Sequence, residues 1–441
     1  MKRKFYILLV LALLGISGLF AQNKVVVAPG DDLIAAIDSA SAGDTIVLQA
    51  GMHVARYTNM TIDKSLAIVA ETSVKPLVYG GQIDVLGEDI DILIEGIEYS
   101  GATVDSLTGT ENLEELEGDY FLNLHSDLVS CGDITVKNCI IRNLNRSVVR
   151  GDRSAYTVEN FLFDDIIITD LRGGGDYGPF RLKSKITFST FTVTNSTFYN
   201  ILNKFIDNQD APSHDMEFLI RNCTFYGWGG GKNAQYLFDI NTNDKARLII
   251  QDCILGKTND DPLADPPFTV NGWRFVEGGI LHAEMLTTAM TPDFVLTLGT
   301  YAETTWNTDE YNQVDVDPDF ANPEAGDFTL PQESPLLEAS QTGGIIGDPR
   351  WHPDYGVGIK ENISAKNFRI YPNPANDVIF LEMDNDLAGS EVSIYNTIGS
   401  RVKHFTSVRP NTSLDIADLE PGMYFVKLGY RQADALKLMV K

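Results

Sequence analysis

A six-residue phrase that recurs five times between residues 134 and 258 constrains the fold of this chain more than any other feature. Each copy reads apolar, any residue, Asn or Asp, small or apolar, any residue, apolar, and the copies are VKNCII, FDDIII, VTNSTF, IRNCTF and IQDCIL. Their polar residues stand at positions 138, 165, 195, 222 and 252, so the steps between copies are 27, 30, 27 and 30 residues. A repeat of this length is typical of a solenoid, in which successive repeats stack on one another.

The residues around each phrase indicate which kind of solenoid this is. They are β-branched and aromatic residues with period-2 alternation, so each repeat is predicted to consist of short strands. The predicted fold class is all-β: a right-handed parallel β-helix with three strands per coil, in which like residues stack roughly 4.8 Å apart. The Asn or Asp column is expected at a corner, because these residues tolerate left-handed backbone. We therefore assign that column a structural role.

The N-terminus carries a targeting signal. Residues 1–21, MKRKFYILLVLALLGISGLFA, combine a basic start with an apolar stretch, which predicts a secretory signal peptide cut after Ala21. No Cys follows the apolar stretch, so a lipoprotein anchor is not expected. No later segment has the roughly 18 apolar residues that a membrane span needs. The mature chain is predicted to be soluble and exported.

The charge balance limits the partners of the protein. Acidic residues outnumber basic ones by 61 to 34, and the formal net charge is −27. Such a field repels polyanions, so neither nucleic acid nor an anionic membrane surface is expected as a partner. The 6 histidines are scattered, and no His/Cys spacing resembles a zinc site.

Four cysteines occur in the exported chain. Cys139, Cys223 and Cys253 occupy the same slot of the repeat, and Cys131 does not. Cys223 and Cys253 lie on successive coils, so an oxidising compartment would allow a disulfide between them. A stack of small buried thiols is the interpretation that we favour.

The chain divides into four parts. Residues 22–355 are predicted to form the β-helix, beginning with a helical cap after Asp31 and Asp32 and ending in an irregular closure from residue 259 onward. The acidic stretch 108–118 is expected to be a protruding loop. Residues 356–366 form a linker, and residues 367–441 contain seven short alternating strands, which predicts a small β-sandwich.

Three aspartates in the closure, Asp315, Asp317 and Asp319, have two interpretations. They could chelate calcium, because hard cations bind several oxygens. The surrounding Asp, Pro and Gly residues instead favour turn-forming roles. Calcium is the sole cofactor candidate at this point, and no metal ligand is assigned.

The C-terminal block closely resembles the type A C-terminal sorting domain of the type IX secretion system. The resemblance is carried by YPNPA at 371–375, IYN at 394–396, PGMY at 421–424 and the Lys-rich end at 437–441. It implies that the secretion machinery is a partner. It also implies that the protein crosses a Gram-negative outer membrane and is then released or attached at the cell surface.

The coils resemble pectin-lyase-like β-helices, in particular the branch of chondroitinase B and alginate lyases. The AGDTIVLQAG segment at 42–51, the corner phrase and the pair Lys183–Ser184 carry this resemblance. The segment GDPRW at 347–351 is similar to uncharacterised β-helix proteins of exported polysaccharide-utilisation systems. In such enzymes one strand of each coil forms the floor of a sugar-binding groove.

The strands expected at this floor are SVVRGD, GPFRLKS, NKFIDNQ, YLFDINT and WRFVEG. Alternation that places Val149, Phe180, Phe205, Phe238 and Phe275 inward leaves the following outward: Arg150, Arg181, Lys183, Lys204, Asp239, Asn241 and Arg274. These residues predict a basic patch, where Arg suits bidentate contacts with uronate carboxylates. An ordinary solvated sheet face is the equally weighted alternative.

Uronate β-elimination needs a neutralised carboxylate, a base and a proton donor. The lyase pattern implies a Lys base, which Lys183 matches, and Glu ligands to calcium shortly before it, where this chain has Asp176 and Gly178. An Arg is expected on the next coil, where Asp207 stands and Lys204 lies nearby. Lys183 and Lys204 are therefore the catalytic candidates. Arg150, Arg181, Asp239, Asn241 and Arg274 are the substrate-binding candidates.

Three function classes follow from this incomplete set. The first is an exported surface protein that binds polysaccharide, with cleavage left open. The second is an active uronate lyase, or a hydrolase with an acidic pair drawn from Asp207, Asp210 and Asp239. The third is a structural adhesin. The first accounts for fold, export and patch without requiring the missing residues.

Overall fold

The computed structural model consists of two compact units, Met1–Tyr355 and Gly356–Lys441. The structure describes residues 23–55, 59–105, 109–124, 130–152, 155–174, 177–229, 236–259, 271–276, 279–291, 307–308, 312–313, 316–340, 343–355, 368–383, 392–396, 401–405, 412–419, 421–428 and 435–441. The predicted signal peptide, residues 1–21, lies outside them. No described helix has the length and apolar character of a membrane span.

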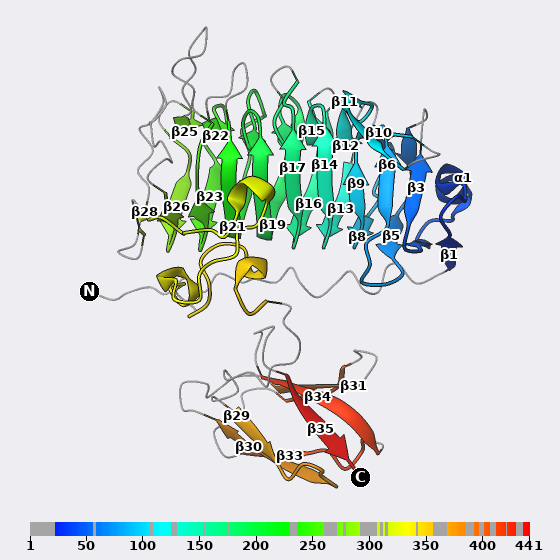
Figure 1. The fold of residues 1–441 in the computed structure, drawn as a ribbon, viewed down its shortest axis with the longest axis vertical. Helices are drawn as coiled ribbons and strands as arrows, with labels where there is room; N and C mark the ends of the chain where they lie inside the picture. The colour runs from blue at the N-terminus through cyan, green and yellow to red at the C-terminus, as the bar shows by residue number, and fades with distance from the viewer. Residues whose placement is uncertain are drawn as a thin grey trace. The chain divides into compact units, whose positions relative to one another are not determined.

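The first unit is a parallel β-helix (Figure 1), and its coils take the right hand that parallel crossover connections adopt. Its larger sheet contains β1 (Lys24–Val27), β2 (Thr45–Leu48), β3 (Met52–Ala55), β5 (Leu66–Ala70), β6 (Leu77–Gly80), β8 (Ile92–Glu95), β9 (Glu98–Ser100), β13 (Ser130–Lys137), β14 (Ile140–Leu144), β16 (Tyr156–Asp164), β17 (Ile167–Leu171), β19 (Ile186–Ile201), β21 (Met216–Trp228), β23 (Ala246–Gln251), β24 (Ile254–Leu255), β26 (His282–Leu286), β27 (Ala289–Met290) and β28 (Asn307–Thr308). The second sheet contains β4 (Met60–Ile62), β7 (Ile83–Val85), β12 (Tyr120–Leu124), β15 (Ser147–Gly151), β18 (Phe180–Leu182), β20 (Ile206–Asp207), β22 (Tyr236–Ile240) and β25 (Asn271–Phe275).

The strand register reproduces the repeat seen in the sequence. Val136 pairs with Phe163, and Phe163 pairs with Val193 on the next coil. Val193 then pairs with Ile220, and Ile220 with Ile250. The predicted steps are therefore the lengths of successive coils, which confirms the β-helix.

The predicted corner column adopts left-handed backbone. The φ angles lie between 49° and 57° at Asn138, Asp165, Asn195, Asn222 and Asp252. Asn195 also donates from Nδ2 to Oδ1 of Asp164 at 2.8 Å, so its side chain reaches a neighbouring carboxylate. A second left-handed ladder, which the sequence analysis missed, consists of Asn143, Asp170 and Asn200.

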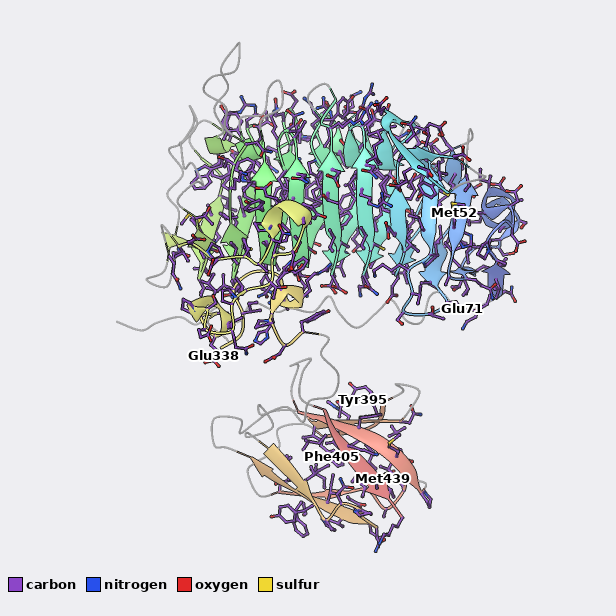
Figure 2. All side chains as sticks on the ribbon, in the orientation of Figure 1. Met52, Glu71, Glu338, Tyr395, Phe405 and Met439 are labelled. Atoms are coloured by element: carbon purple, nitrogen blue, oxygen red, sulfur yellow. The ribbon has the colours of Figure 1, made fainter. Side chains whose placement is uncertain are left out.

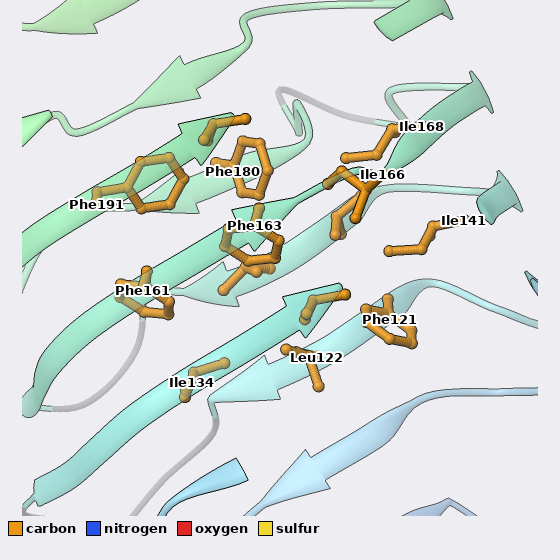
Figure 3. Close-up of a cluster of buried hydrophobic side chains, with 14 of the residues drawn as sticks. Phe121, Leu122, Ile134, Ile141, Phe161, Phe163, Ile166, Ile168, Phe180 and Phe191 are labelled. Atoms are coloured by element: carbon orange, nitrogen blue, oxygen red, sulfur yellow. The ribbon is translucent and has the colours of Figure 1, made fainter. Parts of the chain in front are cut away.

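The interior of the coils is filled by aromatic and branched side chains. Figure 2 draws the side chains of the described residues, and Figure 3 shows a cluster of the buried ones. The ring of Phe180 lies 4.9 Å from those of Phe163 and Phe191, centroid to centroid. All three side chains have no exposed surface. Each coil therefore covers the apolar surface of its neighbours, as a solenoid requires.

The four cysteines are free, buried thiols. In the repeated slot, Cys139, Cys223 and Cys253 each donate S–H to the backbone carbonyl two residues earlier. Ser196 makes the same contact with its hydroxyl. Four of the five copies therefore fill this slot with a small side chain that has one donor, and Ile166 fills it in the fifth. The buried thiols agree with the favoured interpretation of a stack.

Helix α1 (Leu33–Ser39) stands at the N-terminal end of the coils, and its Ala35 backbone N–H donates to Asp32. Leu33 and Ile37 are buried in the core. In contrast, the prediction of a protruding loop at 108–118 was wrong. Residues 111–116 form β11 (Glu111–Leu116), which pairs antiparallel with β10 (Ala102–Val104).

An ion pair explains why that acidic stretch is ordered. Glu111 lies 2.7 Å from a guanidinium nitrogen of Arg142 and accepts a hydrogen bond from the Tyr79 hydroxyl at 2.9 Å. Arg142 also binds Glu98 at 2.6 Å. Glu111 of β11 thus has a basic partner on the coils, which sequence patterning alone does not reveal.

Residues 316–355, which we call the strap, contain the short helices η2 (Pro323–Ala325), η3 (Pro335–Leu337) and η4 (Pro349–Trp351). The Asp, Pro and Gly clusters of this segment predicted that it closes the far end of the β-helix. The structure instead places it along the side of the coils, where Thr197 and Thr224 bind Asp348. Leu330 and Leu336 also pack with Ile254. Polar and apolar groups on the outside of the larger sheet therefore hold it.

The second unit is the predicted β-sandwich. One antiparallel sheet contains β29 (Phe368–Tyr371), β30 (Val378–Met383) and β33 (Thr412–Asp415), and the other contains β31 (Val392–Asn396), β32 (Arg401–Phe405), β34 (Gly422–Leu428) and β35 (Ala435–Val440). Ile379, Ile394 and Leu438 are among the residues of its separate core.

Candidate functional site

The second sheet of the β-helix carries a continuous column of polar residues, one from each strand. Register pairing places them side by side from coil to coil, and we call them the polar column: Thr61, Asp84, Asn123, Arg150, Arg181, Asp207, Asp239 and Arg274. The neighbouring residues Val149, Phe180 and Phe238 are buried in the core. Alternation therefore directs the polar column away from the interior.

Four of the predicted site residues lie in this column: Arg150, Arg181, Asp239 and Arg274. The five residues expected to point inward are all buried in the core: Val149, Phe180, Phe205, Phe238 and Phe275. The coil-to-coil register aligns Phe180 with Ile206 and Phe238 with Trp273. Strand β20 is only two residues long, so the chain offers too little alternation there to fix the register from sequence.

Asp152 joins two coils of the column. It lies 2.9 Å from Nε of Arg150 and 2.7 Å from Nε of Arg181. Arg181 also contacts Asp207, with 3.1 Å between Nη1 and Oδ2. The guanidinium groups of two adjacent coils are thus held by two carboxylates.

A second group of ion pairs surrounds Asp239. Arg274 binds it with two hydrogen bonds, of 2.8 Å from Nε and 2.6 Å from Nη2. The ammonium of Lys204 lies 2.8 Å from Oδ2 of the same carboxylate. Bidentate geometry of this kind is the strong form of an Arg–carboxylate pair. The structure therefore corrects the expectation of a basic patch, because the described column cations have carboxylate partners.

The charged groups of the column are mostly buried, so they also differ from a solvated sheet face. Asp207 and Asp239 have no exposed surface, and Arg150 and Lys204 retain 6% and 7%. Burial would raise the pKa of Asp152, but hydrogen bonds from Arg181 and Arg150 outweigh it and lower that pKa. At Asp207 burial dominates and raises the pKa, although Lys204, Lys183 and Arg181 oppose the shift.

Tyrosine rings cover the guanidinium groups. The Arg181 guanidinium lies 4.1 Å from the centroid of the Tyr177 ring, a separation that suits a cation–π contact. On the coils before Arg150 and Arg274, the ring centroids of Tyr120 and Tyr236 lie 4.8 and 4.7 Å from these guanidinium groups. Tyr177 is half-buried, whereas Tyr120 and Tyr236 are buried.

At its N-terminal end the column consists of a hydroxyl, a carboxylate and an amide, from Thr61, Asp84 and Asn123. Asp84 accepts hydrogen bonds from Nδ2 of Asn59 at 2.8 Å and of Asn123 at 2.6 Å. Asn123 in turn accepts from Arg150 at 3.4 Å. Hydrogen bonds therefore link this end to the ion pairs of the next coil.

Two predicted site residues lie beyond the ends of the column strands. Lys183 follows β18 and keeps 17% of its side chain exposed, with its ammonium 3.9 Å from the exposed Asp210 carboxylate. Asn241 follows β22 and is half-buried, and its Oδ1 makes no hydrogen bond within the described residues. Both residues are therefore partly exposed, although Oδ1 of Asn241 is itself buried.

The calcium hypotheses find little support in the described residues. These contain no group of three or more His, Cys, Asp or Glu placed to hold a metal ion. Asp317 accepts a hydrogen bond from the backbone N–H of Asp319 at 3.0 Å, as in an Asx turn. Asp176 and Asp315 lie outside the described residues.

Asp152 and Tyr177 are parts of the site that were not predicted from the sequence. Asp152 stands two residues after Arg150, so alternation places both on one side of the strand and would have suggested the pair. The contact of Tyr177 with Arg181 depends on the path of a loop, and no signal in the sequence indicates it.

Comparisons with known proteins identify parts of the chain. Residues 369–441 match the family described as Secretion system C-terminal sorting domain. Residues 218–351 match a Domain of unknown function, DUF5123. Beta-agarase A of Zobellia galactanivorans is 31% identical over 86 residues, which are 20% of this chain and 15% of the agarase.

Two solved structures are similar to the chain at low identity. The PL6 family alginate lyase AlyGC matches with 16% identity and a TM-score of 0.41, over 67% of this chain and 40% of the lyase. Pectate lyase Pel9A matches with 12% identity and a TM-score of 0.41, over 75% of this chain and 97% of the lyase.

The C-terminal match agrees with the predicted sorting domain along nearly its whole length. Residues 369–441 cover all but the first residue of the strands β29 to β35, which form a sandwich with its own core. The C-terminal unit is therefore a type IX secretion system sorting domain, and the protein is exported through that system to the cell surface or the medium.

Proposed function

We propose that the protein binds a polysaccharide along its polar column. The observation that carries this proposal is the length and continuity of the column, which adds one residue from each of eight strands. At roughly 4.8 Å per coil, the seven steps from Thr61 to Arg274 span about 34 Å. A linear polymer suits such a surface better than a small molecule does.

Side chains along this surface offer both stacking and hydrogen bonds. Tyr177 is half-buried above Arg181. Four further residues are also partly exposed: Arg181, Lys183, Asn241 and Arg274. The buried ion pairs hold these groups in place before a ligand arrives. A ligand then binds with little loss of side-chain freedom.

The same geometry disfavours β-elimination. A base must accept the proton of the substrate, yet the Lys204 ammonium is buried and bound to Asp239 at 2.8 Å. Arg181 is bound to two carboxylates and is not free to neutralise that of a uronate. Lys183 remains the single lysine of the predicted pair that is part-exposed.

An acidic pair for hydrolysis is disfavoured for the same reason. Asp207 and Asp239 are adjacent in register, but both are fully buried and ion-paired with neighbouring cations. A glycosidic oxygen cannot reach them without displacing those cations. Binding without cleavage is therefore the function that we propose.

The test uses the purified mature chain, residues 22–441, with a panel of uronate and neutral polysaccharides. Binding is followed by calorimetry, and cleavage by the absorbance of unsaturated products and by reducing ends. We expect binding without cleavage. Replacing Tyr177 with Ala should weaken binding several-fold, by about 1 kcal/mol or more, whereas Tyr355→Ala, an exposed tyrosine of the strap, serves as the control.

Cleavage by the wild-type chain that Lys183→Ala abolishes, with binding retained, would instead establish Lys183 as a catalytic base. Failure of every polysaccharide to bind would refute the proposal.

A further inference from the structure

We propose, building on the function proposed above, that the polysaccharide is electrically neutral and not a uronate polymer. The observation behind this proposal is the charge balance of the polar column. Its charged members, together with the residues that they bind in ion pairs, form two equal sets within the described residues. The cations are Arg150, Arg181, Lys204 and Arg274, and the carboxylates are Asp84, Asp152, Asp207 and Asp239.

The geometry of the ion pairs also leaves the cations bound to their carboxylates. Arg274 presents two N–H groups to Asp239, which is the fork that a uronate carboxylate would need. A uronate that took this place would leave the buried Asp239 carboxylate with one cation fewer. Breaking a buried pair in this way is strongly unfavourable.

The rest of the molecule does not attract a polyanion either. The formal net charge of the chain is −27, so approach of a uronate polymer is opposed at low ionic strength. Lys183 is the described cation at the edge of the column with the most distant partner, and the exposed Asp210 carboxylate still lies 3.9 Å from its ammonium. This pair adds one charge of each sign and leaves the balance unchanged.

A neutral sugar matches what remains available. Its hydroxyl groups both donate and accept hydrogen bonds, and the surface offers both kinds of partner. Lys183 and Arg274 supply donors, and the exposed Asp210 carboxylate supplies acceptors, while the ring of Tyr177 offers an apolar face for the C–H groups of a sugar.

The effect of polymer charge on binding can be measured by comparing each uronate polymer with its carboxyl-reduced form. Alginate, polygalacturonate and chondroitin would be measured beside their reduced counterparts, together with neutral galactans, glucans, mannans and xylans. The probe is the mature chain at low and at high salt. We expect at least one neutral or reduced polymer to bind at least about ten-fold more tightly than any uronate polymer, with little dependence on salt.

A charge variant gives a second measurement. Asp210→Asn removes the carboxylate beside Lys183, so it should increase retention of uronate polymers at low salt. Tight binding of a uronate polymer by the wild-type chain, weakening as salt rises, would overturn the neutral assignment and leave polysaccharide binding intact. Absence of increased retention in Asp210→Asn would likewise count against charge balance as the cause. Failure to bind any polymer would refute the proposed function itself, and the neutral assignment with it.

Discussion

The indole N–H of Trp351 donates a hydrogen bond of 2.6 Å to the hydroxyl of Thr197, across 154 residues of sequence. The carboxylate of Asp348 accepts a hydrogen bond of 2.6 Å from the same hydroxyl. Arg350 binds Asp165 of the corner column at 2.6 Å. The strap is therefore attached to the outside of β19 and to the adjacent corner by one compact group of polar contacts.

These contacts should make the stability of the β-helix depend on pH. Burial raises the pKa of Asp348 from 3.8 to about 6, although Arg350 opposes the shift. The folded state thus holds a proton that the unfolded state releases above pH 3.8, so stability is expected to fall as pH rises between about 4 and 6. The two-unit shift corresponds to a loss on the order of 3 kcal/mol.

Asp348→Asn should remove the contribution of this group to the pH dependence, whereas Asp207, whose pKa burial also raises, keeps its own contribution. Glu338→Gln, at an exposed position on the strap, is the matched control and should keep the wild-type profile. Both are checked by denaturant unfolding across that pH range, with Trp351 fluorescence as a local probe. A wild-type profile in Asp348→Asn would show that other groups cause the dependence.

A second prediction concerns the corner column. Asn195 has a φ of 52° and donates to Asp164, so Asn195→Leu loses a conformational preference and a hydrogen bond together. We expect the free energy of unfolding to fall by about 1 to 3 kcal/mol. Asn195→Gly keeps the left-handed backbone and should cost less. Equal denaturation midpoints for the Leu variant and the wild type would contradict the structural role of the ladder.

The fold was predictable because its signal repeats. Each coil must stack Val193 or its equivalent on the coils before and after it, so the same pattern appears five times. The strap has no such redundancy. Arg350 and Asp165 are 185 residues apart, and nothing in the sequence near either residue indicates the contact.

The direction in which the site side chains point was predictable, but the residues that they bind were not. Period-2 alternation correctly placed Arg150 and Arg181 away from the core, because side chains alternate across a strand. Their partners were not predicted, since ion pairs depend on distances between coils and on loops. Because Asp152 binds both Arg150 and Arg181, the expected basic patch is instead a network of ion pairs.

The ion pairs themselves can be tested through stability. Asp239→Ala removes the carboxylate that binds the buried Lys204 ammonium and the Arg274 guanidinium. We expect this change to lower the free energy of unfolding by about 3 to 5 kcal/mol. Asp210→Ala removes an exposed carboxylate and should cost at most about 1 kcal/mol. Combining Asp239→Leu with Lys204→Met should recover part of the loss, as a double-mutant cycle would reveal. A loss of similar size for Asp239→Ala and Asp210→Ala would contradict the network.

The last prediction separates export from folding. Residues 367–441 form a sorting domain with its own core, so their deletion should leave the β-helix folded and retain it in the periplasm. Cell fractionation locates the truncated protein, and resistance to proteolysis tests its fold. The reciprocal chain, a periplasmic reporter fused to residues 356–441, should appear outside the cell and so excludes misfolding as the cause of retention. Export of the truncated protein at the wild-type level would mean that the signal for secretion lies within the β-helix.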